Sequence, residues 1–92
     1  MTEERTVTVV PEDGLHARPA ALFVERANEH DAEVEVGPVD GDLVSAGSMI
    51  AVTSLGVAEG DDVRLVAEGD DATAALDALE AVLTTPEDEL EE

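Results

Sequence analysis

The chain has 92 residues, no cysteine and a formal net charge of −20, from 24 acidic residues against 4 arginines. This length suits one domain with a modest hydrophobic core. The lack of cysteine excludes disulfides, thiolate metal ligands and a cysteine nucleophile. No apolar run approaches the roughly 20 residues that cross a bilayer, and the charged residues 1–5 do not open a signal peptide. We therefore expect a cytoplasmic protein that does not insert into the membrane.

The acidity of the chain also limits its partners and its surroundings. A protein of this charge repels nucleic acid and anionic membranes. At about 1 M salt the Debye length falls to about 3 Å, which screens most of the self-repulsion. The composition thus indicates adaptation to a salty cytoplasm. An acidic disordered chain is the alternative, but 43% of the residues are hydrophobic and they lie in periodic segments.

The first half of the chain predicts a strand and then a helix. Alternating β-branched residues indicate a strand at 6–10, and 11–14 form a turn. From Ala17 the apolar period changes to that of a helix, which ends over 28–31. Its apolar face comprises Ala20, Phe23, Val24 and Ala27.

Two further strands and a short helix follow. Residues 32–36 alternate again, and a short strand begins at 43–44. Ser48 has the character of a helix N-cap, which predicts a helix over 49–55 that ends at Gly56.

The last part predicts one more strand, at 63–67, and one more helix capped by Asp70 or Asp71. The apolar positions of that helix are Ala72, Ala75, Leu76, Leu79, Val82 and Leu83. Pro86 ends it, and 87–92 read as a solvated acidic tail. The element order β-α-β-β-α-β-α predicts one α+β domain over 1–92, with helices on one face of an antiparallel sheet.

Two histidines are the candidates for chemistry. His30 lies in a polar stretch and reads as a surface residue, whereas His16 follows a strand and leads directly into a helix. Unpaired amides at a helix N-terminus attract anions, and Arg18 offers charge-assisted hydrogen bonds to phosphate. Neutral imidazole is a nucleophile near pH 7. The residues alone leave open whether His16 accepts a phosphoryl group or only caps the helix.

Other sites are less well supported by the pattern. The two histidines lack metal-ligand spacing, and no loop has the carboxylate pattern of an EF-hand. We therefore expect no metal site and no cofactor. Among the alternative functions, an acidic cation-binding module is the least supported.

The run Gly14-Leu15-His16-Ala17-Arg18-Pro19-Ala20 resembles the active-site motif of the HPr family, the histidine-containing phosphocarriers of the phosphoenolpyruvate:sugar phosphotransferase system. The segment Ser45–Ile50, with Leu55-Gly56 after it, resembles the regulatory-serine region of that family. The length and the element order match over nearly the whole chain.

The resemblance implies roles for these residues. His16 would take a phosphoryl group on Nδ1 from phosphorylated enzyme I and pass it to the IIA domain of a sugar permease. Arg18 and the backbone N–H groups of Ala17 and Arg18 would stabilise the phosphate. The fold would be an open-faced β-sandwich, a four-stranded antiparallel sheet with three helices on one face.

The resemblance also implies a docking face on the first two helices, with Ala21, Met49, Ile50, Val52 and Leu55. Ordinary core packing is the alternative for 49–55, and we expect these side chains to be divided between core and surface. Ser48 matches a serine that a kinase phosphorylates in some members, with a plain N-cap as the alternative. A carrier that binds two partners in turn on one face is expected to be a monomer.

The chain departs from the family in its charges. Many relatives carry lysines around the docking face, where this chain has Glu25, Asn28, Gly47 and Ala51. We therefore expect docking by apolar contact and Arg18 rather than by electrostatic steering. A carrier in a non-transport phosphorelay, of the dihydroxyacetone kinase or nitrogen type, fits the same residues. A non-catalytic binding regulator fits less well, because such relatives lose the active histidine.

Overall fold

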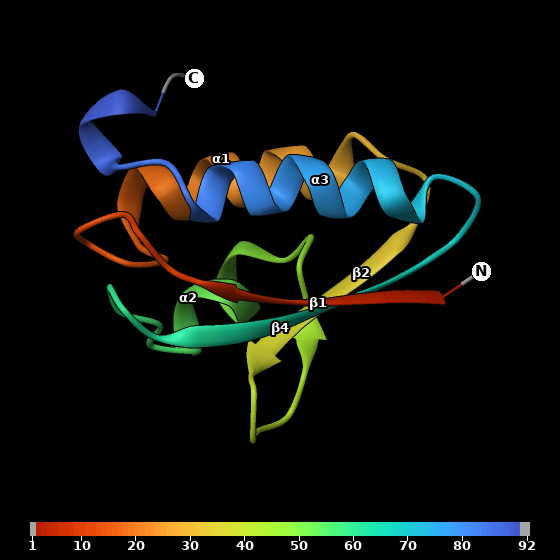
Figure 1. Ribbon diagram of the computed structural model, residues 1–92, viewed down its shortest axis with the longest axis horizontal. Coiled ribbons are helices and arrows are strands. Elements are labelled where there is room, and N and C mark those ends of the chain that lie inside the picture. The colour runs from red at the N-terminus through yellow and green to blue at the C-terminus, as the bar shows by residue number, and fades with distance from the viewer. Residues whose placement is uncertain (1, 91–92) are drawn as a thin grey trace.

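A computed structural model describes residues 2–90 and shows a four-stranded antiparallel sheet with the strand order β1-β4-β2-β3. Figure 1 shows α1 and α3 side by side over one face of this sheet. In chain order the elements are β1 (Thr2–Thr8), α1 (Ala17–Asn28), β2 (Glu33–Pro38), β3 (Val44–Ser45), α2 (Met49–Ser54), β4 (Asp62–Glu68), α3 (Ala72–Leu83) and a final 3-10 turn, η1 (Glu87–Glu89). The predicted α+β open-faced sandwich is confirmed.

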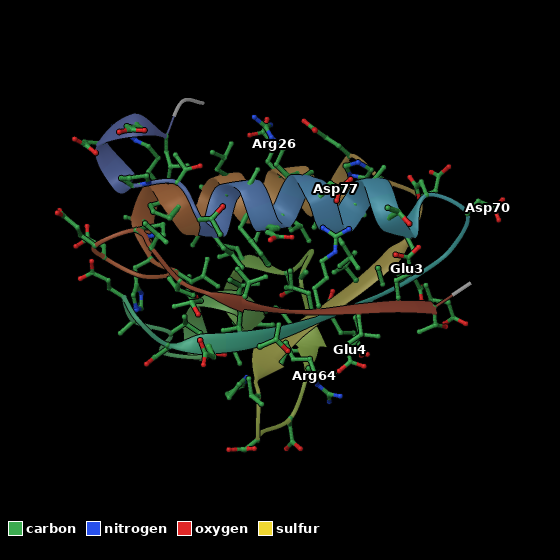
Figure 2. The ribbon with its side chains drawn as sticks, viewed as in Figure 1. Glu3, Glu4, Arg26, Arg64, Asp70 and Asp77 are labelled. Carbon is green, nitrogen blue, oxygen red and sulfur yellow. The ribbon has the colours of Figure 1, made fainter. Side chains whose placement is uncertain are left out.

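The two faces of the sheet differ in polarity because successive side chains of a strand point to opposite sides. Val34 and Val36 of β2 are buried beneath the helices, whereas Glu33 and Glu35 are exposed. On β4 the buried positions likewise alternate with the exposed or half-buried ones. Figure 2 shows Glu4 and Arg64 on the side away from α1 and α3, where they pair at 3.2 Å.

The core lies between the sheet and the two long helices. α3 buries all six apolar residues that its periodicity predicted, Ala72, Ala75, Leu76, Leu79, Val82 and Leu83. On α1 the residues Ala20, Phe23 and Ala27 are buried as predicted, but Val24 is only half-buried and Leu22 takes a place in the core. Among residues 2–90, no helix is both long enough and apolar enough to span a membrane.

The first strand begins earlier than predicted, at Thr2 rather than Thr6. Charged residues on its helix-facing side hide the alternation in the sequence. Arg5 points toward α3 and lies 2.6 Å from Asp77 and 2.8 Å from Glu80. Those two carboxylates, Asp77 first, raise the pKa of Arg5 and keep its charge paired.

The end of the chain corrects the expected solvated tail. Glu87–Glu89 form the 3-10 turn η1, closed by a 2.9 Å hydrogen bond from the Glu89 amide to the Pro86 carbonyl. Leu90 is 7% exposed and belongs to the core cluster. One apolar side chain thus holds this acidic segment against the fold, while residues 91–92 of the expected tail lie outside the described part of the chain.

Candidate functional site

A tight turn places His16 on the surface. The Gly14 amide donates to the Pro11 carbonyl at 2.9 Å, and Gly14 has φ +68°, a conformation that favours glycine. The next residue, Leu15, is fully buried and donates its amide to the Val57 carbonyl at 3.1 Å. Because Leu15 is fixed in the core, His16 emerges at a defined point beside it and is exposed.

The start of α1 has an unusual backbone. His16 occupies the N-cap position in an extended conformation and makes no side-chain cap hydrogen bond. Ala17 follows with φ +51°, which is the left-handed region. A non-glycine residue there costs about 1–3 kcal/mol and persists only where its surroundings impose it. The plain capping role left open for His16 is therefore not what the side chain does in this structure.

The first turn of α1 begins with the backbone amides of Ala17 and Arg18. The amide of Ala20 bonds to the His16 carbonyl at 3.4 Å, and Pro19 has no N–H. Helix geometry gives no intrahelical acceptor to the amides of Ala17 and Arg18. These are the two backbone donors that the resemblance assigned to phosphate, and they follow the exposed His16 directly.

Arg18 supplies the positive charge in this first turn, where α1 carries no acidic residue. Its side chain is exposed. Arg5 pairs with α3, Arg26 pairs with Glu29 at 3.4 Å, and Arg64 pairs with Glu4, all outside this turn. The sequence-predicted pair His16 and Arg18 thus lies together at one helix start.

The second predicted segment forms a capped helix. The Ser48 hydroxyl accepts a hydrogen bond from the Ala51 amide at 3.2 Å, so the predicted N-cap of α2 is confirmed. Gly56 has φ +68° just after the C-cap residue Leu55, as a glycine at a helix end does.

The proposed docking residues are divided between surface and core. Ile50 is 83% exposed and Met49 is 40% exposed, Ala21 is exposed, and Leu55 is half-buried. Val52 is a correction: it is fully buried in the core, because it lies on the inner face of a helix that packs on α1 and β3. Val52 therefore lies beneath the exposed side chains of α2.

Two positions where the family resemblance implied lysine, Asn28 and Gly47, contact each other in this structure. Asn28 at the end of α1 donates from its side-chain amide to the Gly47 carbonyl at 3.2 Å. A Cβ on Gly47 would lie 2.6 Å from the Asn28 side-chain oxygen. This contact fixes the end of α1 to the segment before α2, so it orients the two helices that form the predicted docking face.

The second histidine has a structural position. His30 is half-buried, and its Nδ1 lies 2.9 Å from the Arg26 carbonyl, which requires Nδ1 to carry the proton. Within residues 2–90, no cluster of three or more histidine and carboxylate side chains is arranged to hold a metal ion.

Sequence reasoning missed the features that hold the site in place. The Val57 carbonyl positions Leu15, and Ala17 takes its left-handed backbone, without any local signal at either residue. The indirect signal was Gly14, whose conformation and close approach to Val57 only glycine allows. Together, the sandwich fold and this turn define a class of small α+β proteins that present a histidine at the start of their first helix.

Comparisons with known proteins identify the family. Residues 3–85 match the family model described as "PTS HPr component phosphorylation site". Phosphocarrier protein HPr of Haloferax volcanii is 71% identical over 85 residues, 91% of this chain and 96% of that protein. Phosphocarrier protein HPr of Streptomyces coelicolor is 39% identical over 97% of this chain and 96% of that protein.

A solved structure agrees with both. The crystal structure of phosphocarrier protein HPr from Bacillus anthracis superposes with a TM-score of 0.85 at 39% identity, covering 89% of this chain and 96% of that one. The chain belongs to the HPr family and is a phosphocarrier of the phosphotransferase system.

Proposed function

We propose that His16 accepts a phosphoryl group from phosphorylated enzyme I and passes it to the IIA domain of a sugar permease. The observation that supports this most is the exposed His16 at the start of α1, with the amides of Ala17 and Arg18 and the Arg18 guanidinium in the turn that follows. In the first transfer, the bond from phosphorus to the donor breaks as the bond to the imidazole nitrogen of His16 forms; in the second, that phosphorus–nitrogen bond breaks as the bond to the acceptor forms. The carrier is regenerated when the acceptor takes the group.

The surroundings of His16 favour an added anion. A helix N-terminus stabilises a negative charge by about 0.3–1 kcal/mol, and Arg18 adds charge-assisted hydrogen bonds. On a chain of net charge −20 this local positive potential offsets part of the repulsion of the incoming phosphate. Donor and acceptor both need this one exposed face, so we propose that the carrier is a monomer. We also propose that the carrier is cytoplasmic.

Docking is proposed on the exposed apolar side chains of α2, Met49 and Ile50, with Ala21 and Leu55 beside them. No lysine surrounds them, so the transfer rate should change little between low and molar salt, apart from any loss of the folded state. A rate that rises steeply as salt is removed would contradict docking without steering.

Ser48 is proposed first as the cap of α2, on the strength of its bond to the Ala51 amide. Phosphorylation by a kinase would replace that cap by a dianion at the edge of the docking face, next to Met49 and Ile50. It would weaken the binding of an acidic partner. Incubation with the kinase and a phosphate assay at Ser48 tests this second role.

The test of the carrier role is transfer of labelled phosphate from phosphoenolpyruvate through the cognate enzyme I in about 1 M potassium chloride. Wild type and the His30→Ala control should take up acid-labile label, and His16→Ala should take up none. A folded wild type without label would overturn the transfer role and favour a binding regulator. Label that persists in His16→Ala would show that His16 is not the phosphoryl acceptor.

A further inference from the structure

The segment 57–61, between α2 and β4, is bonded to the chain just before the turn that leads to His16. The Val9 amide donates to the Asp61 carbonyl at 2.9 Å, and the Gly60 amide donates to the Val9 carbonyl at 2.8 Å. Val9 is 1% exposed, so its backbone groups are shielded from water. Figure 1 shows the connections before α1 and before β4 at the same end of the molecule. The chain therefore enters the turn from a fixed point.

The same segment holds the chain just after the turn. The fully buried Leu15 donates its amide to the Val57 carbonyl at 3.1 Å. A Cβ on Gly14 would lie 2.1 Å from that carbonyl oxygen, so the two pieces of backbone are in direct contact. His16 is the residue after Leu15, and its place on the surface follows from where the Val57 carbonyl holds Leu15.

One side chain closes the segment that does this. The Asp61 carboxylate accepts the Ala58 amide at 2.9 Å, while the Asp61 amide donates to the Ala58 carbonyl at 3.0 Å. Between them Gly60 has φ +89°, which lets four residues reverse direction. Asp61 thus binds both backbone groups of Ala58 and fixes the shape of the turn at 58–61.

The contacts of Asp61 and Leu15 meet on a single peptide group. The Ala58 N–H and the Val57 carbonyl are the two ends of one planar unit, and the Asp61 carboxylate holds the first while the Leu15 amide binds the second. A carboxylate is a strong acceptor for an amide, and a hydrogen bond on the N–H polarises the carbonyl of the same group. A rotation of this peptide would move the acceptor of Leu15, and His16 would move with Leu15.

We propose that Asp61 is a positioning residue for phosphotransfer. Its carboxylate fixes the peptide group between Val57 and Ala58, that peptide fixes Leu15, and Leu15 fixes the place of His16. Asp61 acts through the backbone and not on the phosphoryl group. This inference rests on the proposed role of His16 as the acceptor.

The experiment compares Asp61→Ala with Asp62→Ala, its matched control. The Asp62 carboxylate is also exposed and bonds to the Thr8 hydroxyl at 2.5 Å, so its removal takes away the same charge and one hydrogen bond but leaves the Ala58 amide held. Phosphotransfer from enzyme I is measured in molar potassium chloride with the carrier as the varied substrate. Asp61→Ala should lower kcat about fivefold at unchanged KM, because the placement of His16 changes and partner binding does not. Asp62→Ala should match wild type.

A conservative variant separates the hydrogen bond from the charge. Asp61→Asn removes the charge but keeps a side-chain oxygen that accepts the Ala58 amide, so it should recover most of the lost kcat. Equal losses of kcat in Asp61→Asn and Asp61→Ala, or in Asp62→Ala and Asp61→Ala, would show that charge and not position is responsible, and would overturn the proposal.

Hydrogen exchange of the Leu15 amide, followed by NMR, tests the positioning step without any phosphate. The exchange rate should rise about fivefold in Asp61→Ala and stay at the wild-type value in Asp62→Ala and Asp61→Asn. An unchanged rate in Asp61→Ala would show that the carboxylate does not hold this peptide, and faster exchange with full kcat would show that the bond does not position His16. A wild type that accepts no phosphate would instead overturn the proposed function itself.

Discussion

The starts of α1 and α2 solve the same problem in opposite ways. At α2 the Ser48 hydroxyl satisfies the Ala51 amide, and the backbone turns into the helix without strain. At α1 the N-cap residue His16 makes no side-chain cap bond, and Ala17 adopts φ +51°. The α2 start is therefore capped by its own N-cap side chain, whereas the α1 start is not.

This difference separates a supporting helix start from a reactive one. A capped N-terminus gains about 1 kcal/mol from its own side chain. The start of α1 forgoes that gain and carries a strained residue as well. Its position is imposed by the Gly14 turn and the buried Leu15 instead.

The strongest test of this comparison substitutes alanine for two glycines, Gly14 before α1 and Gly56 after α2. Gly14 and Gly56 both have φ +68°, but a Cβ on Gly14 would meet the Val57 carbonyl at 2.1 Å, whereas one on Gly56 would meet nothing within 4 Å. Gly14→Ala should lower the free energy of unfolding by about 3 kcal/mol, and Gly56→Ala by about 1 kcal/mol. Denaturant unfolding in molar salt measures both, and equal losses would show that the α1 turn is not the constrained one.

A second test removes the side chain at each N-cap position. Ser48→Ala should cost about 1 kcal/mol of stability because the Ala51 amide loses its acceptor. His16→Ala should cost less than about 0.5 kcal/mol, since an exposed side chain without a cap bond contributes little. Thermal melts of the two variants against wild type provide the measurement. A loss at His16 as large as at Ser48 would mean that His16 does cap α1.

A third, smaller effect concerns the backbone of Ala17. Ala17→Gly should raise the free energy of unfolding by about 0.5 kcal/mol, because glycine adopts a positive φ without a Cβ clash. Ala51→Gly in the first turn of α2 should lower it by about 1 kcal/mol, as glycine does inside a helix. Chemical denaturation of the pair gives the sign of each change, and a loss at both positions would argue against strain at Ala17.

The smallest expected effect is at the start of α3. The Asp71 carboxylate accepts the amides of Asp31 and Ala32, and these bonds, that of Asp31 first, hold the pKa of Asp71 below its ordinary value of 3.8. A depressed pKa adds stability that is complete above the ordinary value and is lost as pH falls through the folded value. The difference in the free energy of unfolding between wild type and Asp71→Asn should therefore become smaller below about pH 4. If acid unfolding curves show the same difference at every pH, the Asp71 carboxylate does not stabilise the fold through its charged form.

Most of the fold followed from periodicity, and the exceptions have physical causes. The six buried residues of α3 recur at helical spacing and were all predicted. The strand from Thr2 was not, because Arg5 sits on its inner side and is neutralised by carboxylates 72 and 75 residues later in the sequence. Asp70 or Asp71 was expected to cap α3. Asp71 is the N-cap residue, but its carboxylate makes no cap hydrogen bond and instead accepts the Ala32 amide at the entry of β2.

The candidate site also contains some features that the sequence predicted and others that it did not. The sequence run around His16 was sufficient to place His16, Arg18 and the two backbone amides, since they are neighbours in the chain. The role of the Val57 carbonyl was not predicted, because Val57 meets Leu15 only in the folded chain. The burial of Val52 depended on which side of a six-residue helix faces the core.

The pairing of β1 with β4 has a consequence for synthesis of the protein. Their nearest partners across the register, Thr8 and Asp62, are 54 residues apart, and the amide of Val10 bonds to the carbonyl of Leu83. The first strand, which leads to the His16 turn, therefore leaves the ribosome long before any strand exists to hold it. Assembly of the sheet waits for nearly the whole chain, because contacts this distant in sequence carry the entropy cost of a long loop. During that interval the dense negative charge of the chain keeps the unpaired strand from associating with other chains.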